Sequence, residues 1–237
     1  MKKFILSSVC IFLILGSFAQ KTAEEFLNSG NEKFKNQNYT DAIKDYDKAI
    51  EINANLSEAY YNRGLAERKV PDFNAAIQNF DKVIELKPNH INAYFYRGLT
   101  KISIKDYTAA ITDFDKVITM DSTIADVYYN RGLCKYINQD YENAIKDFDK
   151  TIVMDPKSSD AYTYRGNAKK KINQLPESIA DYDKAIELNP NNTNAFINRG
   201  IAKYLTDKKT EACDDWKKAS DLGNKSADQL IKENCQQ

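Results

Sequence analysis

Residues 60–64 of the chain read Tyr60-Tyr61-Asn62-Arg63-Gly64, and the glycine that closes this stretch recurs at a fixed interval of 34 residues. The recurring glycines are Gly30, Gly64, Gly98, Gly132, Gly166 and Gly200. Equal spacing without an insertion indicates an internal repeat, and this period is typical of a helix–turn–helix unit. With each glycine at position 8, the six repeats span residues 23–56, 57–90, 91–124, 125–158, 159–192 and 193–226.

Other positions of the repeat carry the residue types that packed helical hairpins need. Position 4 is aromatic, as Phe26, Tyr60, Tyr94, Tyr128, Tyr162 and Phe196. Position 20 is small, as Ala42, Ala76, Ala110, Ala144, Ser178 and Ala212. Position 24 is aromatic again, as Tyr46, Phe80, Phe114, Phe148, Tyr182 and Trp216. Small residues let two helices cross closely while aromatic residues fill the space beside them, so these positions predict the core of each hairpin.

The prolines agree with two helices in each repeat. Pro88, Pro156 and Pro190 stand at position 32, where they would end the second helix. Pro71 and Pro176 fall near the starts of second helices, where a missing N–H costs little.

With these positions, the chain resembles the tetratricopeptide repeat family over residues 23–226, and the second repeat matches the family pattern closely. The resemblance implies an all-α fold. Two antiparallel helices per repeat would stack into a right-handed superhelical solenoid, with the first helices lining its concave face. Residues 224–237 are expected to add a C-terminal capping helix, because a solenoid must cover its last apolar face.

Two positions depart from the family pattern. Position 7 is arginine in five repeats, as Arg63, Arg97, Arg131, Arg165 and Arg199, and position 11 is mostly lysine. Acidic residues recur in step with the arginines, at position 25 as Asp47, Asp81, Asp115, Asp149 and Asp183, and at position 23 as Asp45, Asp113, Asp147 and Asp181. We predict a structural ladder of Arg–Asp ion pairs, because a planar guanidinium matches a carboxylate at two points. The alternative is that the arginines hold an acidic ligand.

The composition speaks against several functions. Basic and acidic residues balance at 34 each, so no surplus of charge favours nucleic acid or an anionic membrane. His90 is the only histidine, and its place in a turn suggests a solvated residue and not a ligand or base. Nucleotide-binding, nucleophile-elbow and paired-cysteine motifs do not occur. We therefore expect no enzymatic activity, no cofactor and no metal.

The concave surface is the expected binding site, and in the family it is lined by positions 2, 5, 6, 9, 12 and 13. Candidate contact residues at positions 5 and 6 are Tyr61, Asn62, Phe95, Tyr96, Tyr129, Asn130, Tyr164 and Asn198. Amide side chains pair with the backbone of an extended peptide, and tyrosines add contact area. The alternative is that position 5 packs against the neighbouring hairpin while the asparagines are only solvated. The family's clamp for acidic chaperone tails is excluded, because no repeat has lysine at position 2 or 5.

The N-terminus and the cysteines indicate export. Residues 1–19 combine Lys2 and Lys3 with a short apolar run and a small-x-small end, which is typical of a signal peptide. The mature chain would start at residues 20–22 and be periplasmic or secreted. Its cysteines would be Cys134, a small buried filler, and Cys213 and Cys235, which we predict to form a disulfide.

These observations predict a protein–protein interaction scaffold or adaptor of the cell envelope, which holds a peptide or a partner protein in its concave groove. A glycan- or cell-wall-binding module is the alternative, because aromatic and amide side chains also suit sugars. A purely architectural role would place the contacts on the convex face and the array ends. The sequence specifies neither the partner nor the oligomeric state.

Overall fold

The computed structural model describes residues 21–235, so the predicted signal peptide at 1–19 lies outside the described residues. The described part of the chain forms thirteen helices and no strand: α1 (Ala23–Lys35), α2 (Tyr39–Ile52), α3 (Ser57–Lys69), α4 (Phe73–Leu86), α5 (Ile91–Ser103), α6 (Tyr107–Met120), α7 (Ala125–Ile137), α8 (Tyr141–Met154), α9 (Ser159–Lys171), α10 (Leu175–Leu188), α11 (Thr193–Leu205), α12 (Lys209–Asp221) and α13 (Lys225–Asn234). Each 34-residue repeat holds one pair of helices, and α13 follows the last pair.

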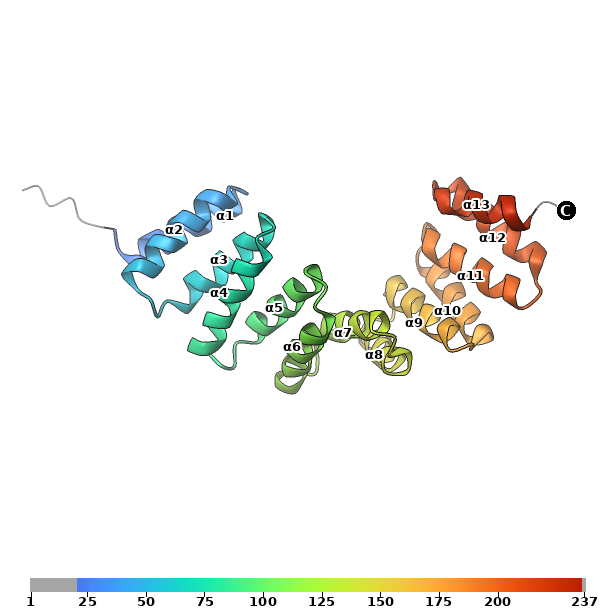
Figure 1. The fold of residues 1–237 in the computed structure, drawn as a ribbon, viewed down its shortest axis with the longest axis horizontal. Helices are drawn as coiled ribbons and strands as arrows, with labels where there is room; N and C mark the ends of the chain where they lie inside the picture. The colour runs from blue at the N-terminus through green and yellow to red at the C-terminus, as the bar shows by residue number, and fades with distance from the viewer. Residues whose placement is uncertain (1–20, 236–237) are drawn as a thin grey trace, which may run out of the picture.

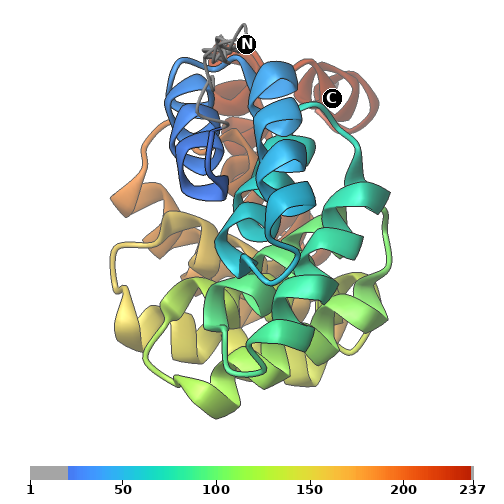
Figure 2. The same cartoon turned by 90° about the vertical axis from the view of Figure 1, so that its left-hand side faces the viewer.

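The helices pack in chain order into an open solenoid. Each first helix contacts the second helix of its own repeat, and each second helix contacts the first helix of the next repeat. Figure 1 shows the resulting arch, in which α1, α3, α5, α7 and α9 face the inner side and their partners face outward. Figure 2, turned by 90°, shows that the two arms of the arch rise on the same side. The predicted all-α solenoid is confirmed.

The glycine at position 8 lets the two helices of a hairpin approach each other. A Cβ atom on Gly98 would lie 2.8 Å from a ring carbon of Phe114, closer than real contacts allow, and every other position-8 glycine faces its position-24 ring in the same way. Ala110 at position 20 is fully buried beside this contact. Positions 20 and 24 therefore form the centre of each hairpin core as predicted, whereas most of the position-4 aromatics are only half-buried.

First helices end in the same backbone turn in every repeat. The residue at position 15 has a positive φ, as Gln37, Pro71, Lys105, Gln139, Asn173 and Asp207. In five of these repeats its N–H donates to the carbonyl at position 12, for example from Lys105 to Ile102 at 2.9 Å, which is the helix-ending Schellman arrangement. Pro71 lies near the start of α4 as predicted, immediately before the N-cap residue Asp72. It occupies this turn, however, and has no N–H to donate to the position-12 carbonyl.

The C-terminal helix covers the last repeat as predicted. Ala227 of α13 is fully buried, and Leu230 and Ile231 pack against the cluster around Trp216. Cys213 and Cys235 form the predicted disulfide, with their Cα atoms 5.8 Å apart, which ties the end of α13 to α12. No helix in residues 21–235 is both long and apolar enough to cross a membrane.

Candidate functional site

The position-7 arginines form the ladder that the sequence predicts, and each one joins two repeats. Arg97 donates from Nη1 to Asp81 of the preceding repeat at 2.6 Å and from Nε to Asp113 of its own repeat at 3.0 Å. Its guanidinium also stacks on the ring of Tyr94, 5.3 Å from the centroid. Burial lowers the pKa of Arg97, but the hydrogen bonds and charges of the two carboxylates outweigh it and raise the pKa overall. The arginines are therefore held inside the scaffold and are not available to an external ligand.

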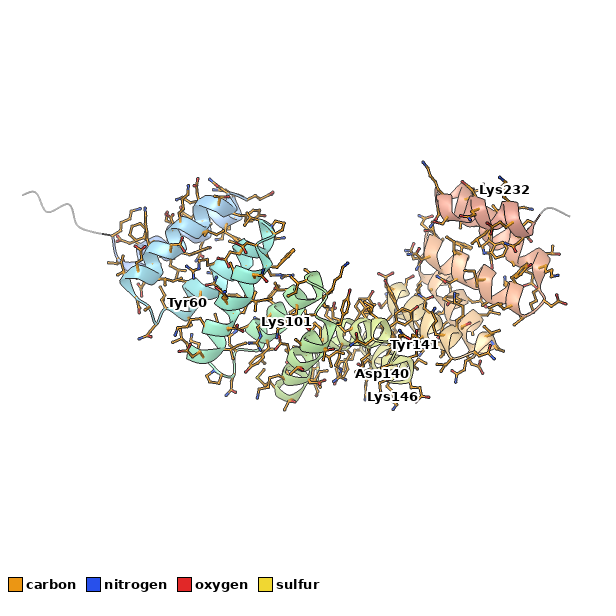
Figure 3. The ribbon with its side chains drawn as sticks, viewed as in Figure 1. Tyr60, Lys101, Asp140, Tyr141, Lys146 and Lys232 are labelled. Carbon is orange, nitrogen blue, oxygen red and sulfur yellow. A yellow bond between two sulfur atoms is a disulfide. The ribbon has the colours of Figure 1, made fainter. Side chains whose placement is uncertain are left out.

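The position-11 lysines also belong to this ladder. The sequence predicted the arginine–aspartate pairs but not this contribution of the lysines. The Lys101 Nζ atom lies 2.8 Å from the Asp113 carboxylate, and Figure 3 labels Lys101 on α5. Figure 3 also labels Tyr60 on α3, the ring on which Arg63 stacks. The same lysine–aspartate contact recurs in every repeat except the second.

The second repeat replaces both members of this contact at once. Glu67 stands at the lysine position and Asn79 at the aspartate position, and the Asn79 amide donates to Glu67 at 2.6 Å. Arg63 donates to the Asn79 oxygen from Nε at 2.9 Å. Burial raises the pKa of Glu67 to about 7, and the hydrogen bond from Asn79 opposes this shift only in part.

The predicted contact residues at position 5 are half-buried within the hairpins. Tyr61, Phe95 and Tyr129 each place their ring about 6 Å from the position-24 phenylalanine of the same repeat, with centroid distances of 6.0, 6.1 and 6.1 Å. Burial raises the pKa of Tyr61 to about 12. These rings thus pack in large part into their own hairpins, whereas the alternative interpretation placed them against the neighbouring hairpin.

The predicted residues at position 6 lie between successive repeats. Asn62 donates to Asn31 of the first repeat at 2.8 Å, and Asn198 accepts from Lys170 at 2.7 Å. Tyr96 stacks on Phe80, at 6.4 Å between centroids. Tyr164 makes a contact of the same kind, stacking on Phe148 of the preceding repeat, whereas Asn130 donates to the carbonyl of Asp126 within its own helix.

Two adjoining cavities open on the inner face between the first three repeats. One, of about 300 Å³, is lined by Phe34, Leu65, Arg68, Lys69 and Tyr96. The other, of about 230 Å³, is lined by Asn31, Phe34, Lys35, Tyr46, Asn62 and Leu65. Phe34 and Leu65 line both cavities, so we treat the two together as the inner cleft. The cleft contains Asn62 and Tyr96 from the predicted set, but its other residues come from positions 9, 12, 13 and 24.

Arg68 distinguishes the inner cleft from the rest of the inner face. It is one of six arginines in the chain, and the other five form the ladder. Its Nε atom is buried without a hydrogen-bond partner, and its guanidinium lies over the ring of Tyr96 at 5.3 Å from the centroid. Burial lowers the pKa of this guanidinium. Sequence reasoning missed Arg68, although position 12 is apolar or aromatic in four of the six repeats.

Comparison with known protein families settles the class of this chain. The family described as "Tetratricopeptide repeat" matches residues 57–90, 91–124 and 125–158, and the family described as "TPR repeat" matches residues 30–67 and 166–207. The chain belongs to the tetratricopeptide repeat family. As a tetratricopeptide protein it is a scaffold for interactions with other proteins or peptides.

Solved structures of other tetratricopeptide proteins share the fold. The structure of MamA is 27% identical, with a TM-score of 0.66, and the match covers 70% of this chain and 96% of that one. YrrB, whose structure is described as having an unusual peptide-binding site, is 21% identical with a TM-score of 0.69, covering 79% and 97%. A tetratricopeptide protein from Parabacteroides merdae is 20% identical with a TM-score of 0.61, covering 90% and 84%. No curated protein matches the chain by sequence.

The residues with reactive side chains have structural roles in this tetratricopeptide array. His90 is half-buried and has a capping role: it is the N-cap of α5, accepts from the Ala93 N–H at 3.1 Å and lies 5.1 Å from the Tyr61 ring. Cys134 is fully buried, and burial raises the pKa of its thiol to about 12. Residues 21–235 contain no cluster of histidine, cysteine or acidic side chains that could hold a metal.

Proposed function

We propose that this chain is an exported scaffold that holds an extended peptide segment of a partner protein in the inner cleft of its first three repeats. The observation that carries the proposal is the pair of adjoining cavities that share Phe34 and Leu65. An extended chain advances about 3.3 Å per residue and alternates its side chains, so it suits two neighbouring cavities along one groove.

The lining residues support a peptide as the occupant. Phe34 and Leu65 offer apolar surface, while Asn62 has an amide oxygen that can accept from a peptide N–H. Asn31 already accepts from both Tyr46 and Asn62, at 2.9 and 2.8 Å. The asparagine side chains are therefore oriented before a ligand arrives, which lowers the entropic cost of binding.

A photoreactive amino acid at Leu65 tests the peptide proposal. Lys146 is the matched control, because it is exposed on α8 at the outer side of the arch. We expect crosslinks from position 65 in envelope extract to map to one continuous segment of one protein, and a synthetic copy of that segment to bind the purified chain. Equal products from both positions, or recovery of glycan alone from position 65, would contradict the proposal.

Export rests on the leader-like residues 1–19 and is tested separately. We expect the protein recovered from intact cells to begin at Gln20 and to lie outside the cytoplasmic membrane. N-terminal sequencing and cell fractionation measure this, and an uncleaved cytoplasmic chain would refute it without affecting the peptide site.

A further inference from the structure

The cationic side of the inner cleft has no acidic counterpart. Arg68, Lys69 and Lys35 line its two cavities, and none of the lining residues is acidic. The Arg68 side chain makes no hydrogen bond or ion pair within residues 21–235, although its Nε atom is buried. Leaving the buried Nε–H of this guanidinium without an acceptor costs free energy, which a carboxylate in the cavity would recover.

The equivalent residue of the fifth repeat shows that this arrangement is specific to the cleft. Lys170 occupies the same position 12 and donates to Asn198 at 2.7 Å, so that cation has an acceptor from the following repeat. The acceptor position next to Arg68 is Tyr96 instead, which offers a ring face to the guanidinium, and the buried Nε–H has no hydrogen-bond partner. The aromatic ring holds the guanidinium plane in place by cation–π stacking.

We propose that the inner cleft recognises an acidic side chain, aspartate or glutamate, of the bound peptide through Arg68. This inference rests on the proposed peptide-binding function and names the residue type that the site selects. We take a side chain as the source of the carboxylate, because Phe34 and Leu65 join the two cavities into one cleft along which a longer peptide can lie. Arg68 lines only one of the two cavities, so a C-terminal carboxylate is the competing source, which the design of the test removes.

A displayed library of random 12-residue peptides tests the proposal on the purified chain. The peptides are fused at their C-terminal ends, so only a side chain can supply a carboxylate. We expect selection to enrich one acidic residue next to an apolar one. Replacing that acid with its amide should weaken binding of the synthetic peptide by about tenfold or more, as expected for a lost charge-assisted hydrogen bond.

Two variants assign the effect to Arg68. Arg68→Met keeps the aliphatic packing and removes the charge, and Lys170→Met makes the same change at the equivalent position of the fifth repeat. We expect only Arg68→Met to abolish the preference for acid over amide. Its melting temperature should stay equal or rise, because the variant removes an unpaired, partly buried charge. A structural role for Arg68 would instead lower the melting temperature.

The arginine Nε–H resonances give a direct readout of contact. The chain has six arginines, and five of them already donate from Nε to a ladder residue. The selected peptide should shift the Arg68 signal and leave those five in place. Peptides selected without an acidic residue, or an acid preference that survives Arg68→Met, would overturn this inference alone. A library that yields no binder would overturn the peptide-binding function as well.

Discussion

Replacing the two unusual residues of the second repeat with those found in the other repeats is the sharpest test of how the ladder stabilises the array. In that repeat Glu67 and Asn79 replace the lysine and aspartate that meet in the other five. Glu67→Lys together with Asn79→Asp recreates the arrangement seen at Lys101 and Asp113, whose Nζ and Oδ2 atoms lie 2.8 Å apart. Each single substitution creates a buried charge conflict that the second one resolves.

The magnitudes follow from burial. Glu67 is 7% exposed and Asn79 is 3% exposed. Lysine alone at position 67 would lie beside Arg63 with no carboxylate from position 79, and a buried charge without its partner costs about 3 kcal/mol or more. Aspartate alone at position 79 would meet the Glu67 carboxylate, although Arg63 offsets part of that repulsion. The double variant should unfold within about 1 kcal/mol of the parent, giving a coupling free energy of about 2 kcal/mol or more.

Urea unfolding of the parent, both single variants and the double variant at pH 7.5 measures the coupling. The third repeat supplies the matched control, because Lys101→Glu with Asp113→Asn installs the second repeat's own arrangement there. Both double variants should recover stability that their single variants lose. Additive effects, with coupling below about 0.5 kcal/mol in both repeats, would refute the idea that positions 11 and 23 form one electrostatic unit.

Three other predictions follow from individual residues. Burial raises the pKa of Glu67 to about 7 from 4.5, so the folded state holds a proton that the unfolded chain loses, and stability should fall by roughly 2–3 kcal/mol between pH 5 and 8. Glu67→Gln should remove this fall, which denaturation at several pH values checks. Pro71→Asn should raise the free energy of unfolding by about 1–2 kcal/mol, because asparagine tolerates the positive φ and can donate to the Arg68 carbonyl. Thermal unfolding measures this change, and a lower melting temperature would contradict the idea that proline strains the turn. Serine at both Cys213 and Cys235 should destabilise α13 by up to about 3 kcal/mol, seen as faster amide exchange confined to that helix, whereas uniform exchange would rule out local stapling.

The helical hairpins were predictable because one short pattern repeats six times in the sequence. Glycine at position 8, a small residue at position 20 and an aromatic residue at position 24 constrain the same helix crossing. Agreement among them leaves little freedom in the placement of the helices. Pro71 shows the limit of this reasoning: its ring disfavours the turn conformation, but the packing of the flanking helices imposes that conformation on the turn.

The candidate site was less predictable, for a geometric reason. Side chains three residues apart share one face of a helix, so position 5 points the same way as position 8. Position 8 faces the second helix, and the ring of Tyr61 accordingly contacts the ring of Phe80. Positions 6, 9 and 12–13 lie on the neighbouring face of the first helix, farther from the second helix, and they place Asn62, Leu65 and Arg68 in the inner cleft. Periodicity identifies the inner helices, but the cavities depend on how far each hairpin rotates against the next.

The net charge of the chain gives no indication of this site. Four ladder arginines, such as Arg97, each contact two aspartates, and Arg63 contacts Asp47 and Asn79. These repeated contacts confine most arginine charge to the joints between repeats. A net charge near zero then says little about the inner face, because the ladder dominates the sum. Within the cleft, Arg68 and Lys69 retain charge that no lining carboxylate balances. Overall neutrality argues against broad binding of polyanions and remains compatible with local recognition of a single carboxylate.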